Sequence, residues 1–400
     1  MPSFIRWHRP PKFMLRICHI ITQLELGGAQ QNTLYTLSHL DRQRFAPSLI
    51  SGPKGLLDED AVKGDWPTTF IPNLVRPIHP FKDIAALGTL YKILRRERPQ
   101  VVHTHSSKAG ILARVAAYAA GIPVIVHTFH GFGFTPEQPG WLRWLYVLVE
   151  KICAGLSTHL IFVSEDNRQE AAALKIGRNT PNSLIHSGIS IKTAVPAAIR
   201  EERGLPPEAW LVISVGNFKP QKNPLDLIRT AKAVIAQDKM VYFLLVGDGP
   251  LRIEAEDLSR EEAVDEHVHF LGWRRDAPEL IAACDAFLLT SLWEGLPRAL
   301  VEAGAQSRPA VAYAVNGVKD LLQEGENGFP IEPKNWAAAA EKLLWLKNHP
   351  VEAQRMGSQA KNRISVDFNI DQMVREQESL YEALYDRVPL KEVYGLPSRL

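Results

Sequence analysis

Cysteine is scarce in this chain of 400 residues. The three cysteines, Cys18, Cys153 and Cys284, are widely spaced and form no Cys-x-x-Cys pair. An odd number of isolated cysteines argues against a disulfide framework and against a cysteine-based zinc site. We therefore expect a protein of a reducing compartment.

Long hydrophobic runs are also missing. The most apolar stretch, residues 141–163, contains Arg143 and Glu150, whereas a membrane-spanning helix needs about 20 predominantly apolar residues. The apolar stretch near the amino terminus is interrupted by Arg16 and His19, and no small-residue cleavage site follows it. These absences predict a cytoplasmic protein without a membrane span.

Two motifs of other enzyme classes are incomplete. A nucleotide-dependent oxidoreductase needs Gly-x-Gly-x-x-Gly at the start of a helix, but the run from Gly247 to Arg252 lacks the last glycine. No Asp-x-Asp follows a predicted strand, and the acidic residues 58–60 are expected to form a solvated turn. Because catalytic Mg²⁺ and Mn²⁺ are held by such carboxylates, we expect no metal ion and no other cofactor.

The chain does contain a recurrent pattern of short apolar runs. Each run ends in a glycine-rich or histidine-rich loop that precedes a helical pattern, which predicts parallel sheets covered by helices. We predict a doubly wound α/β domain over residues 1–190, with an extension at 1–14, and a second such domain over residues 191–368. Residues 369–400 are expected to form a helix and tail that pack back towards the first domain.

Charge is unevenly distributed. Residues 1–196 contain 22 basic and 13 acidic residues, whereas the remainder contains 24 basic and 31 acidic residues. Such asymmetry is often only a solvated face, but it also marks domains that meet an anionic surface. Phe4, Trp7 and Phe13 alternate with cations, so we consider peripheral contact with an anionic membrane, to which residues 141–146 would add. The favoured alternative for residues 141–146 is a buried amphipathic helix.

Residues 290–306 are the most informative segment, because a predicted strand there ends in a tight turn that opens a helix. Gly295 permits the turn, and Pro297 suits the first helical position, where a missing N–H costs nothing. The helical amides from Arg298 onward lie at the positive end of the helix dipole, which favours a bound diphosphate.

Two carboxylates flank this turn. Glu294 precedes the helix, and Glu302 can reach back because helical side chains tilt towards the amino terminus. A carboxylate there can accept both hydroxyls of a ribose. On spacing alone, the alternative is that Glu294 is a turn residue and Glu302 an exposed helical carboxylate.

Further loops carry motifs in a definite order. They are Gly27-Gly28-Ala-Gln, His103-Thr-His105, His130-Gly131, Phe162-Val-Ser-Glu165, residues 216–223, Gly247-Asp-Gly-Pro250, Phe270-Leu-Gly272, Glu294-Gly-Leu-Pro297 with Glu302, and Val315-Asn-Gly317. In this order and spacing the chain resembles, from about Leu15 to Asn369, a retaining family 4 glycosyltransferase of the GT-B superfamily, of the bacterial polysaccharide and glycolipid type. The resemblance implies two Rossmann-like domains that face each other across a cleft.

The resemblance also implies roles for individual residues. Glu302 would bind the ribose of a nucleotide sugar, Glu294 the transferred sugar, and Lys222 the diphosphate, while His130 would meet the reacting sugar from the other domain. We expect His130, Lys222 and Glu294 to be catalytic. The expected donor-binding residues are Gly27, Gly28, Asn217, Lys219, Lys222, Gly247, Gly272, Glu294, Gly295, Leu296, Pro297, Arg298 and Glu302, and the expected acceptor-binding residues are His105 and Ser106. For His103, His105 and His127 the preferred alternative is a structural role.

The chain departs from the family pattern at two places. The family often has an arginine where Asn217 stands, and asparagine cannot neutralise a phosphate, so Lys219 is the candidate replacement. Asn316 stands where two glycines are common.

The implied activity is metal-independent transfer of a sugar from a nucleotide sugar to a hydroxyl, with retention of anomeric configuration. The acceptor would be a glycan or lipid-linked intermediate of cell-surface polysaccharide synthesis, and no nucleic acid is involved. The alternatives are a nucleotide-sugar epimerase or sugar phosphorylase of the same architecture, and a non-catalytic two-domain sugar-binding protein.

Overall fold

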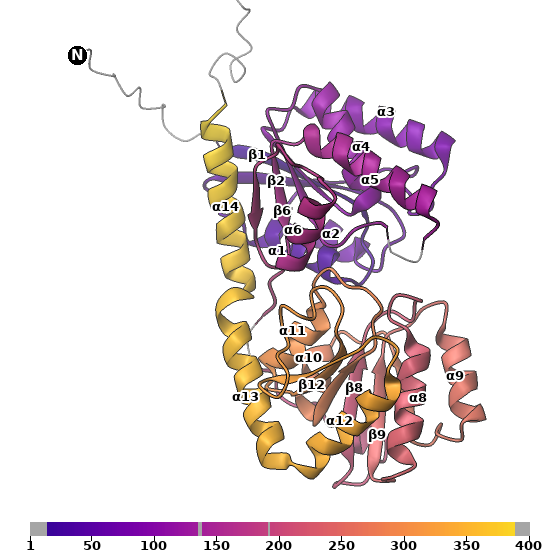
Figure 1. Ribbon diagram of the computed structural model, residues 1–400. Helices are drawn as coiled ribbons and strands as arrows, with labels where there is room; N and C mark the ends of the chain where they lie inside the picture. Colours follow the sequence, from indigo (N-terminus) through magenta and orange to yellow (C-terminus); the bar gives the residue numbers. More distant parts are fainter. Residues whose placement is uncertain (1–13, 135–137, 191–192, 389–400) are drawn as a thin grey trace, which may run out of the picture. The chain divides into compact units, whose positions relative to one another are not determined.

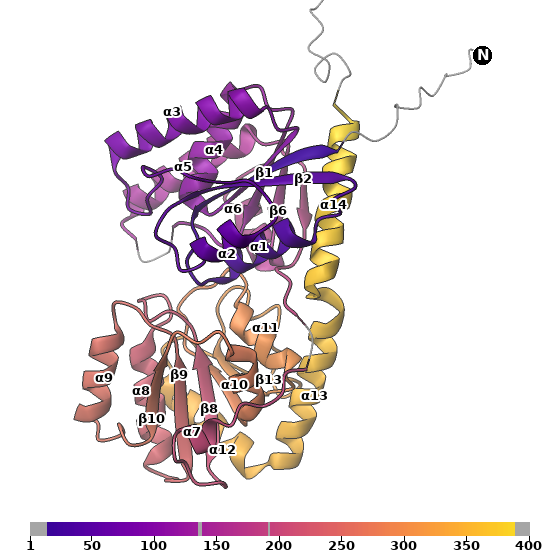
Figure 2. The same ribbon diagram turned by 180° about the vertical axis from the view of Figure 1, so that it is seen from behind.

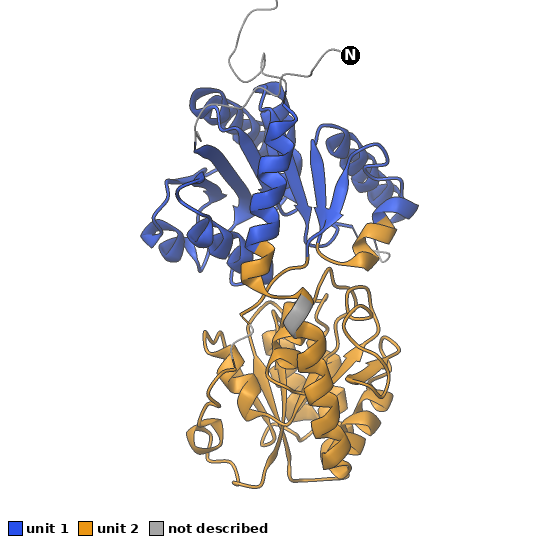
Figure 3. Cartoon of the chain, turned by 90° about the vertical axis from the view of Figure 1, so that its left-hand side faces the viewer, with its two compact units in different colours: residues 1–162, 171–185, 374–400 blue, residues 163–170, 186–373 orange. Residues whose placement is uncertain are grey.

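The computed structural model describes residues 14–134, 138–190 and 193–388, which form two compact units. Unit 1 contains Met1–Phe162, Ala171–Ile185 and Val374–Leu400, and unit 2 contains Val163–Glu170 and His186–Met373 (Figure 3). Phe4, Trp7 and Phe13, which motivated a membrane contact, lie outside the described residues. No helix among the described residues is long and apolar enough to cross a bilayer.

Unit 1 is built on a parallel sheet of seven strands in the order β3-β2-β1-β4-β5-β6-β7 (Figures 1 and 2). The strands are β1 (Leu15–Gln23), β2 (Phe45–Gly52), β3 (Thr68–Phe70), β4 (Val101–His105), β5 (Val124–Phe129), β6 (His159–Phe162) and β7 (Asn182–Leu184). The helices are α1 (Gly28–His39), α2 (Asp58–Lys63), α3 (Pro80–Glu97), α4 (Ser107–Ala119), α5 (Gly140–Gly155), α6 (Glu165–Ala173) and α14 (Ile370–Asp386). The last two cross the boundary between the units.

Neighbouring residues of one strand in unit 1 pack into different cores. Ile20 of β1 joins the core formed with α3 and α4, whereas Ile21 joins the core formed with α1 and α2. Because successive side chains of a strand point to opposite faces, helices cover both faces of the sheet, as predicted. The strand order reverses between β1 and β4, and ligands of such folds bind outside the carboxyl ends of the strands at this reversal.

Unit 2 contains a parallel sheet of six strands in the order β10-β9-β8-β11-β12-β13. The strands are β8 (Trp210–Val215), β9 (Val241–Val246), β10 (Val268–Gly272), β11 (Ala286–Leu289), β12 (Ala310–Tyr313) and β13 (Gly328–Ile331). The helices are α7 (Ile199–Glu202), α8 (Pro224–Ile235), α9 (Arg252–Glu261), α10 (Ala277–Ala283), α11 (Arg298–Ala305), α12 (Trp336–Asn348) and α13 (Pro350–Asp367). The order reverses between β8 and β11, so the loops after these two strands are where a ligand is expected.

The long helix predicted near the carboxyl terminus is α14, and its second part belongs to unit 1. Arg44 pairs with Glu378 and Glu382 of this helix, and Tyr381 is fully buried. The segment Val163–Glu170 instead belongs to unit 2, so the compact units do not follow a single break in the sequence.

Two local predictions are wrong. Residues 58–60 form the first turn of α2 rather than a solvated turn, because acidic side chains suit the positive end of a helix and the Asp58 carboxylate accepts a hydrogen bond from the amide of Gly55 at 3.0 Å. Pro297 precedes α11 as its cap instead of occupying the first helical position.

Candidate active site

The loops after β8 and β11 of unit 2 form one joined structure. The Thr290 hydroxyl lies 3.1 Å from the carbonyl of Lys222 and 3.0 Å from that of Asn223, and the Leu292 amide donates to the carbonyl of Gln221 at 2.8 Å. These hydrogen bonds fix the loop after β8 against the loop after β11 at the point where the strand order reverses.

Two further backbone hydrogen bonds join the neighbouring loops. The Phe218 amide donates to the carbonyl of Asp248 at 2.9 Å, and the Gly247 amide donates to the carbonyl of Gly272 at 2.8 Å. The structure therefore brings the unit 2 residues predicted for donor binding to one edge of the sheet. They are Asn217, Lys219, Lys222, Gly247, Gly272, residues 294–298 and Glu302.

An ion pair between Lys222 and Glu294 lies at this edge. The Glu294 side chain is only 6% exposed, whereas that of Lys222 is 22% exposed. A carboxylate this buried needs a counter-charge, because removing a charge from water costs several kcal/mol. The ammonium group has three donors, so Lys222 can satisfy Glu294 and still bind an anion.

A second ion pair lies at the start of α11. The Nε of Arg298 donates to Oε1 of Glu302 at 2.9 Å, and the Glu302 side chain is 15% exposed. Neither glutamate is thus an ordinary exposed carboxylate. Glu302 keeps a second oxygen with its lone pairs for a ligand, and the Arg298 guanidinium adds positive charge beside the helix start.

The turn at Gly295 is braced by the loop that contains Gly317. A Cβ at Gly317 would lie 2.1 Å from the carbonyl oxygen of Gly295, and Gly317 has a φ of +74°, so only glycine fits there without a shift of the backbone. The Gly317 amide donates to the carboxylate of Asp166 at 3.0 Å. The sequence did not predict the contact between Gly295 and Gly317 or the hydrogen bond to Asp166, because these residues lie in segments that are far apart in the chain.

The corresponding edge of unit 1 lies at the ends of β1 and β4. The hydroxyls of Thr22 and Ser106 are 2.7 Å apart, and Ser106 has a φ of +61°. Gly27 caps α1 and Gly28 begins it. Both glycines and Ser106, which were predicted from different motifs, thus lie beside the strand-order reversal of unit 1.

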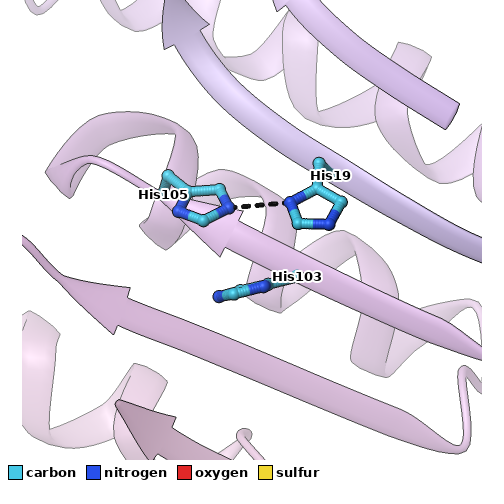
Figure 4. A group of neighbouring side chains, drawn as sticks. All are labelled: His19, His103 and His105. Atoms are coloured by element: carbon cyan, nitrogen blue, oxygen red, sulfur yellow. Dashed lines mark hydrogen bonds between the residues drawn. The ribbon is translucent and has the colours of Figure 1, made fainter. Parts of the chain in front are cut away.

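A row of histidines continues from this edge into unit 1. The Nε2 of His130 lies 3.1 Å from Nδ1 of His105, and Nε2 of His105 lies 3.0 Å from Nδ1 of His19 (Figure 4). His130 is half-buried, whereas His105 is 3% exposed and His19 fully buried. Both ring nitrogens of His105 face other histidines, so its ring has no nitrogen left for an acceptor, in contrast to its predicted role in acceptor binding.

Burial determines the protonation of these rings. It lowers the pKa of His130 to about 4 and that of His19 to about 3. It also lowers the pKa of His103 and of His105 well below the usual value, with smaller contributions from neighbouring histidines. All four imidazoles are therefore neutral near pH 7.

The group His19, His103 and His105 has ligand atoms that all lie within 4.8 Å of one another, which suits a metal ion (Figure 4). However, His103 contacts the Tyr381 hydroxyl at 2.6 Å and the Thr128 hydroxyl at 2.7 Å. With the contacts of His19 and His105 above, every ring nitrogen of the group except Nε2 of His19 has a hydrogen-bond partner. Hydrogen bonding thus accounts for this cluster better than metal ligation.

Comparison with known proteins covers both units. Residues 196–363 match the family described as "Glycosyl transferases group 1", and residues 27–188 match the "Glycosyl transferase 4-like domain". The chain is 32% identical over 378 residues to the "UDP-Gal:alpha-D-GlcNAc-diphosphoundecaprenol alpha-1,3-galactosyltransferase" of Escherichia coli, covering 92% of this chain and 96% of that protein.

Two solved structures show the same fold. One is Anabaena Alr3699/HepE in complex with UDP and glucose, with a TM-score of 0.80, 20% identity, and coverage of 92% of this chain and 100% of that chain. The other is sucrose-phosphate synthase from Thermosynechococcus elongatus, with a TM-score of 0.82, 19% identity, and coverage of 93% and 99%. These are structures of the GT-B fold, and the predicted pair of parallel-sheet, Rossmann-like domains is confirmed.

Proposed function

Since this chain belongs to the group 1 glycosyl transferases, we propose that it transfers a hexosyl residue from a uridine diphosphate sugar to a hydroxyl of a lipid-linked glycan in polysaccharide synthesis. The relative from Escherichia coli is named for UDP-Gal and for a diphosphoundecaprenol-linked sugar, and one structural neighbour contains UDP and glucose. In this chain the proposal rests above all on one observation, the ion pair between Lys222 and Glu294 beside the start of α11.

The chemistry of the transfer requires a group that stabilises the leaving diphosphate. Breaking the bond between the anomeric carbon and the phosphate leaves negative charge on the phosphate oxygen. We assign the neutralisation of this charge to the Lys222 ammonium and to the first amides of α11, because preorganised donors are most effective where charge develops. Lys219 is the further candidate cation, in place of an arginine at Asn217.

The two carboxylates hold the remainder of the donor in this proposal. The free oxygen of Glu302 accepts hydrogen bonds from the ribose hydroxyls, and Glu294 accepts them from hydroxyls of the hexose. Gly27 and Gly28 of unit 1 allow their backbone to approach the phosphates. Because this set supplies charge and hydrogen bonds without a metal ion, the transfer is proposed to be metal-independent.

Unit 1 is proposed to hold the acceptor, beside Ser106 and His130. The transfer is proposed to retain the anomeric configuration, with the acceptor hydroxyl attacking on the face from which the diphosphate leaves. The leaving phosphate then takes the proton of that hydroxyl, so no protein carboxylate needs to become a covalent nucleophile. His130 supports this step as a hydrogen-bonding partner of the reacting sugar.

The function is tested by incubating the full-length protein with UDP-galactose and a diphospho-lipid-linked N-acetylglucosamine. We expect UDP release that depends on the acceptor, persists in a chelator, and gives a new α linkage by NMR. Conversion of the sugar nucleotide without acceptor would indicate an epimerase. A β linkage would contradict retention, and activity that is lost in the chelator and restored by Mn²⁺ would contradict metal independence.

The brace between Gly317 and Gly295 gives a separate prediction. Gly317→Ala places a Cβ against the Gly295 carbonyl and therefore moves the turn between Glu294 and α11. We expect the affinity of this variant for UDP to be roughly tenfold weaker, which is equivalent in free energy to the loss of about one good hydrogen bond. The matched control is Gly325→Ala, where φ is +69° and no described heavy atom lies within 4 Å of the added Cβ. It should lose about 1–2 kcal/mol of stability to backbone strain and keep its UDP affinity. Equal affinities in a calorimetric titration of both variants would contradict the brace.

A membrane contact through α5 is the second part of the proposal. The interpretation of residues 141–146 as a buried helix is wrong, because Trp141 is 71% and Trp144 65% exposed. Leu145 and Ile152 are also exposed. Together with the two tryptophans they recur at helical spacings of three, four and seven residues and therefore share one side of α5. Lys151 lies on the same side of the helix and is exposed. An exposed apolar stripe with a cation, in a half of the chain rich in Lys and Arg, suits an anionic membrane surface.

Such a surface would place the enzyme where a lipid-linked acceptor is found. The cytoplasmic leaflet carries anionic lipids that attract basic surfaces, so we propose peripheral binding at the cytoplasmic face. The double variant Trp141→Ser/Trp144→Ser should bind vesicles containing phosphatidylglycerol at least about 100-fold more weakly, since burying each of the two large apolar side chains is worth about 1.5–3 kcal/mol.

Co-sedimentation of the full-length protein with these vesicles measures this effect. Trp336→Ser, which removes an exposed tryptophan of unit 2, is the control and should not change binding. Wild-type binding should weaken with salt, because screening removes the electrostatic part. Failure of the wild type to bind at low salt would reject the membrane contact while leaving the transferase activity untouched.

A further inference from the structure

The three histidines His130, His105 and His19 come from neighbouring parts of one sheet. His19 lies in β1 and His105 at the end of β4, and these strands are paired in parallel. His130 follows the end of β5, which pairs with β4. The contacts of 3.1 Å and 3.0 Å between successive rings make a continuous chain of imidazoles from the half-buried His130 to the fully buried His19.

A chain of neutral imidazoles has only two hydrogen-bonding arrangements. Each neutral ring carries one N–H and one acceptor nitrogen, and both nitrogens of His105 are used by its two neighbours. Either every N–H in the chain points towards His130, or every N–H points towards His19. The tautomer of His130 is therefore coupled, through His105, to the tautomer of His19.

The buried end of the chain decides between the two arrangements. Nε2 of His19 is buried and has no hydrogen-bond partner among the described residues. If the hydrogens pointed inward, an N–H would be left unpaired at this position, whereas the outward arrangement leaves only an unpaired acceptor there. Buried orphaned N–H groups are the rarer case in proteins, so the outward arrangement is favoured.

We propose that His19 and His105 are positioning residues that hold His130 in one tautomer, with its hydrogen on Nδ1 and with Nε2 accepting from His105. In this arrangement Nδ1–H of His19 donates to Nε2 of His105, and Nδ1–H of His105 donates to Nε2 of His130. His130 then offers a ligand a hydrogen-bond donor, and it does not act as a general base. This assignment rests on the proposed function for its meaning in catalysis, because His130 is there the partner of the reacting sugar.

His103 packs against the rings of His19 and His105 but is not one of the three hydrogen-bonded imidazoles. Its ring centroid lies 4.9 Å from that of His19 and 4.2 Å from that of His105, and its own nitrogens contact Tyr381 and Thr128. Tyr381 belongs to α14, and its hydroxyl donates to the Gln377 side chain at 3.3 Å. Helix α14 thus helps to fix the ring of His103, against which the rings of His19 and His105 pack.

The experiment is nitrogen NMR of the full-length protein labelled with ¹⁵N at histidine, near pH 7 and without substrate. The His130 resonances are assigned by their loss in His130→Asn. We expect a single tautomer with the proton on Nδ1 in the wild type. In His105→Phe, which offers His130 no donor, the His130 resonances should shift towards the tautomer protonated at Nε2.

A conservative variant separates positioning from packing. In His105→Gln, the side-chain amide can donate to His130 and its carbonyl can accept from His19, so the wild-type tautomer should persist. Turnover should fall about tenfold in His105→Phe, the equivalent of one hydrogen bond, with little change in donor KM, and should stay within roughly threefold of wild type in His105→Gln. The control His127→Gln removes a buried histidine that contacts the Thr104 hydroxyl and should leave the His130 tautomer unchanged.

Three results would overturn the proposal. They are a wild-type His130 protonated at Nε2, a His130 tautomer that does not respond to His105→Phe, and stoichiometric zinc in the purified protein with metal-shifted resonances of His19, His103 and His105. Because the tautomer is measured without substrate, its outcome is independent of transferase activity. The expected tautomer in a protein that transfers no sugar would refute the proposed function alone.

Discussion

Replacing Lys222 by alanine is expected to lower kcat about 10²- to 10³-fold, the usual cost of removing one well-placed donor from a site of developing negative charge. The Lys222 ammonium pairs with Glu294 at the strand-order reversal of unit 2 and keeps donors for the leaving diphosphate. Steady-state kinetics with UDP-galactose measure the effect. A normal kcat with only a raised donor KM would place Lys222 in ground-state binding and contradict its role in the transition state.

Loss of the fold must be separated from loss of catalysis in this variant. Lys222→Ala leaves the nearly buried Glu294 carboxylate without its partner, which typically costs about 3–5 kcal/mol of stability. The double variant Lys222→Ala/Glu294→Gln removes the unpaired charge and should recover much of the stability but none of the turnover. Lys63→Ala, which breaks an exposed Lys–Glu pair with Glu59 at 3.4 Å, should change neither property, because exposed pairs contribute only about 0–1 kcal/mol.

Replacing Glu302 by alanine is expected to weaken donor binding about 100-fold. The carboxylate is proposed to accept hydrogen bonds from two ribose hydroxyls, and a hydrogen bond to a charged group is worth about 1.5–3 kcal/mol. The ribose is remote from the reacting bond, so these contacts are alike in the ground state and in the transition state. The effect should therefore appear in KM and in the calorimetric Kd for UDP, and kcat should change little.

A matched pair in the same unit provides the control for Glu302. The Nε of Arg252 donates to Oε1 of Glu256 at 2.7 Å across one turn of α9, which is the arrangement of Arg298 and Glu302 in α11. Glu256→Ala removes the same kind of helical ion pair and should leave UDP affinity unchanged. Equal loss of affinity in both variants would mean that Glu302 acts only by stabilising its helix.

The central part of the candidate site was predictable because its determinants are local. The apolar run Ala286–Leu289 is β11 in the structure, and the turn at Gly295 leads into α11. Strand, turn and helix start are each specified by residues within a few positions, so the sequence indicates them directly. The positions of Glu294 and Glu302 relative to the helix start follow from the same local pattern.

The partners of these residues were not predictable because they depend on strand register. Lys222 and Glu294 are brought together by the pairing of β8 with β11, and His19, His105 and His130 by the pairing of β1, β4 and β5. No local signal in the sequence states which strands pair or in what register. For residues 141–146 the sequence offered both an exposed and a buried helix and favoured the buried one for a related reason, since an apolar helical face has the same sequence pattern whether or not another element covers it.

The most direct test is a crystal structure of the protein with UDP-galactose. We expect the diphosphate to lie beside the start of α11 within hydrogen-bonding distance of Lys222, the ribose hydroxyls to contact Glu302, and the galactose hydroxyls to contact Glu294. A nucleotide sugar bound away from Lys222, Glu294 and Glu302 would contradict the assignment of this edge of unit 2 as the donor site.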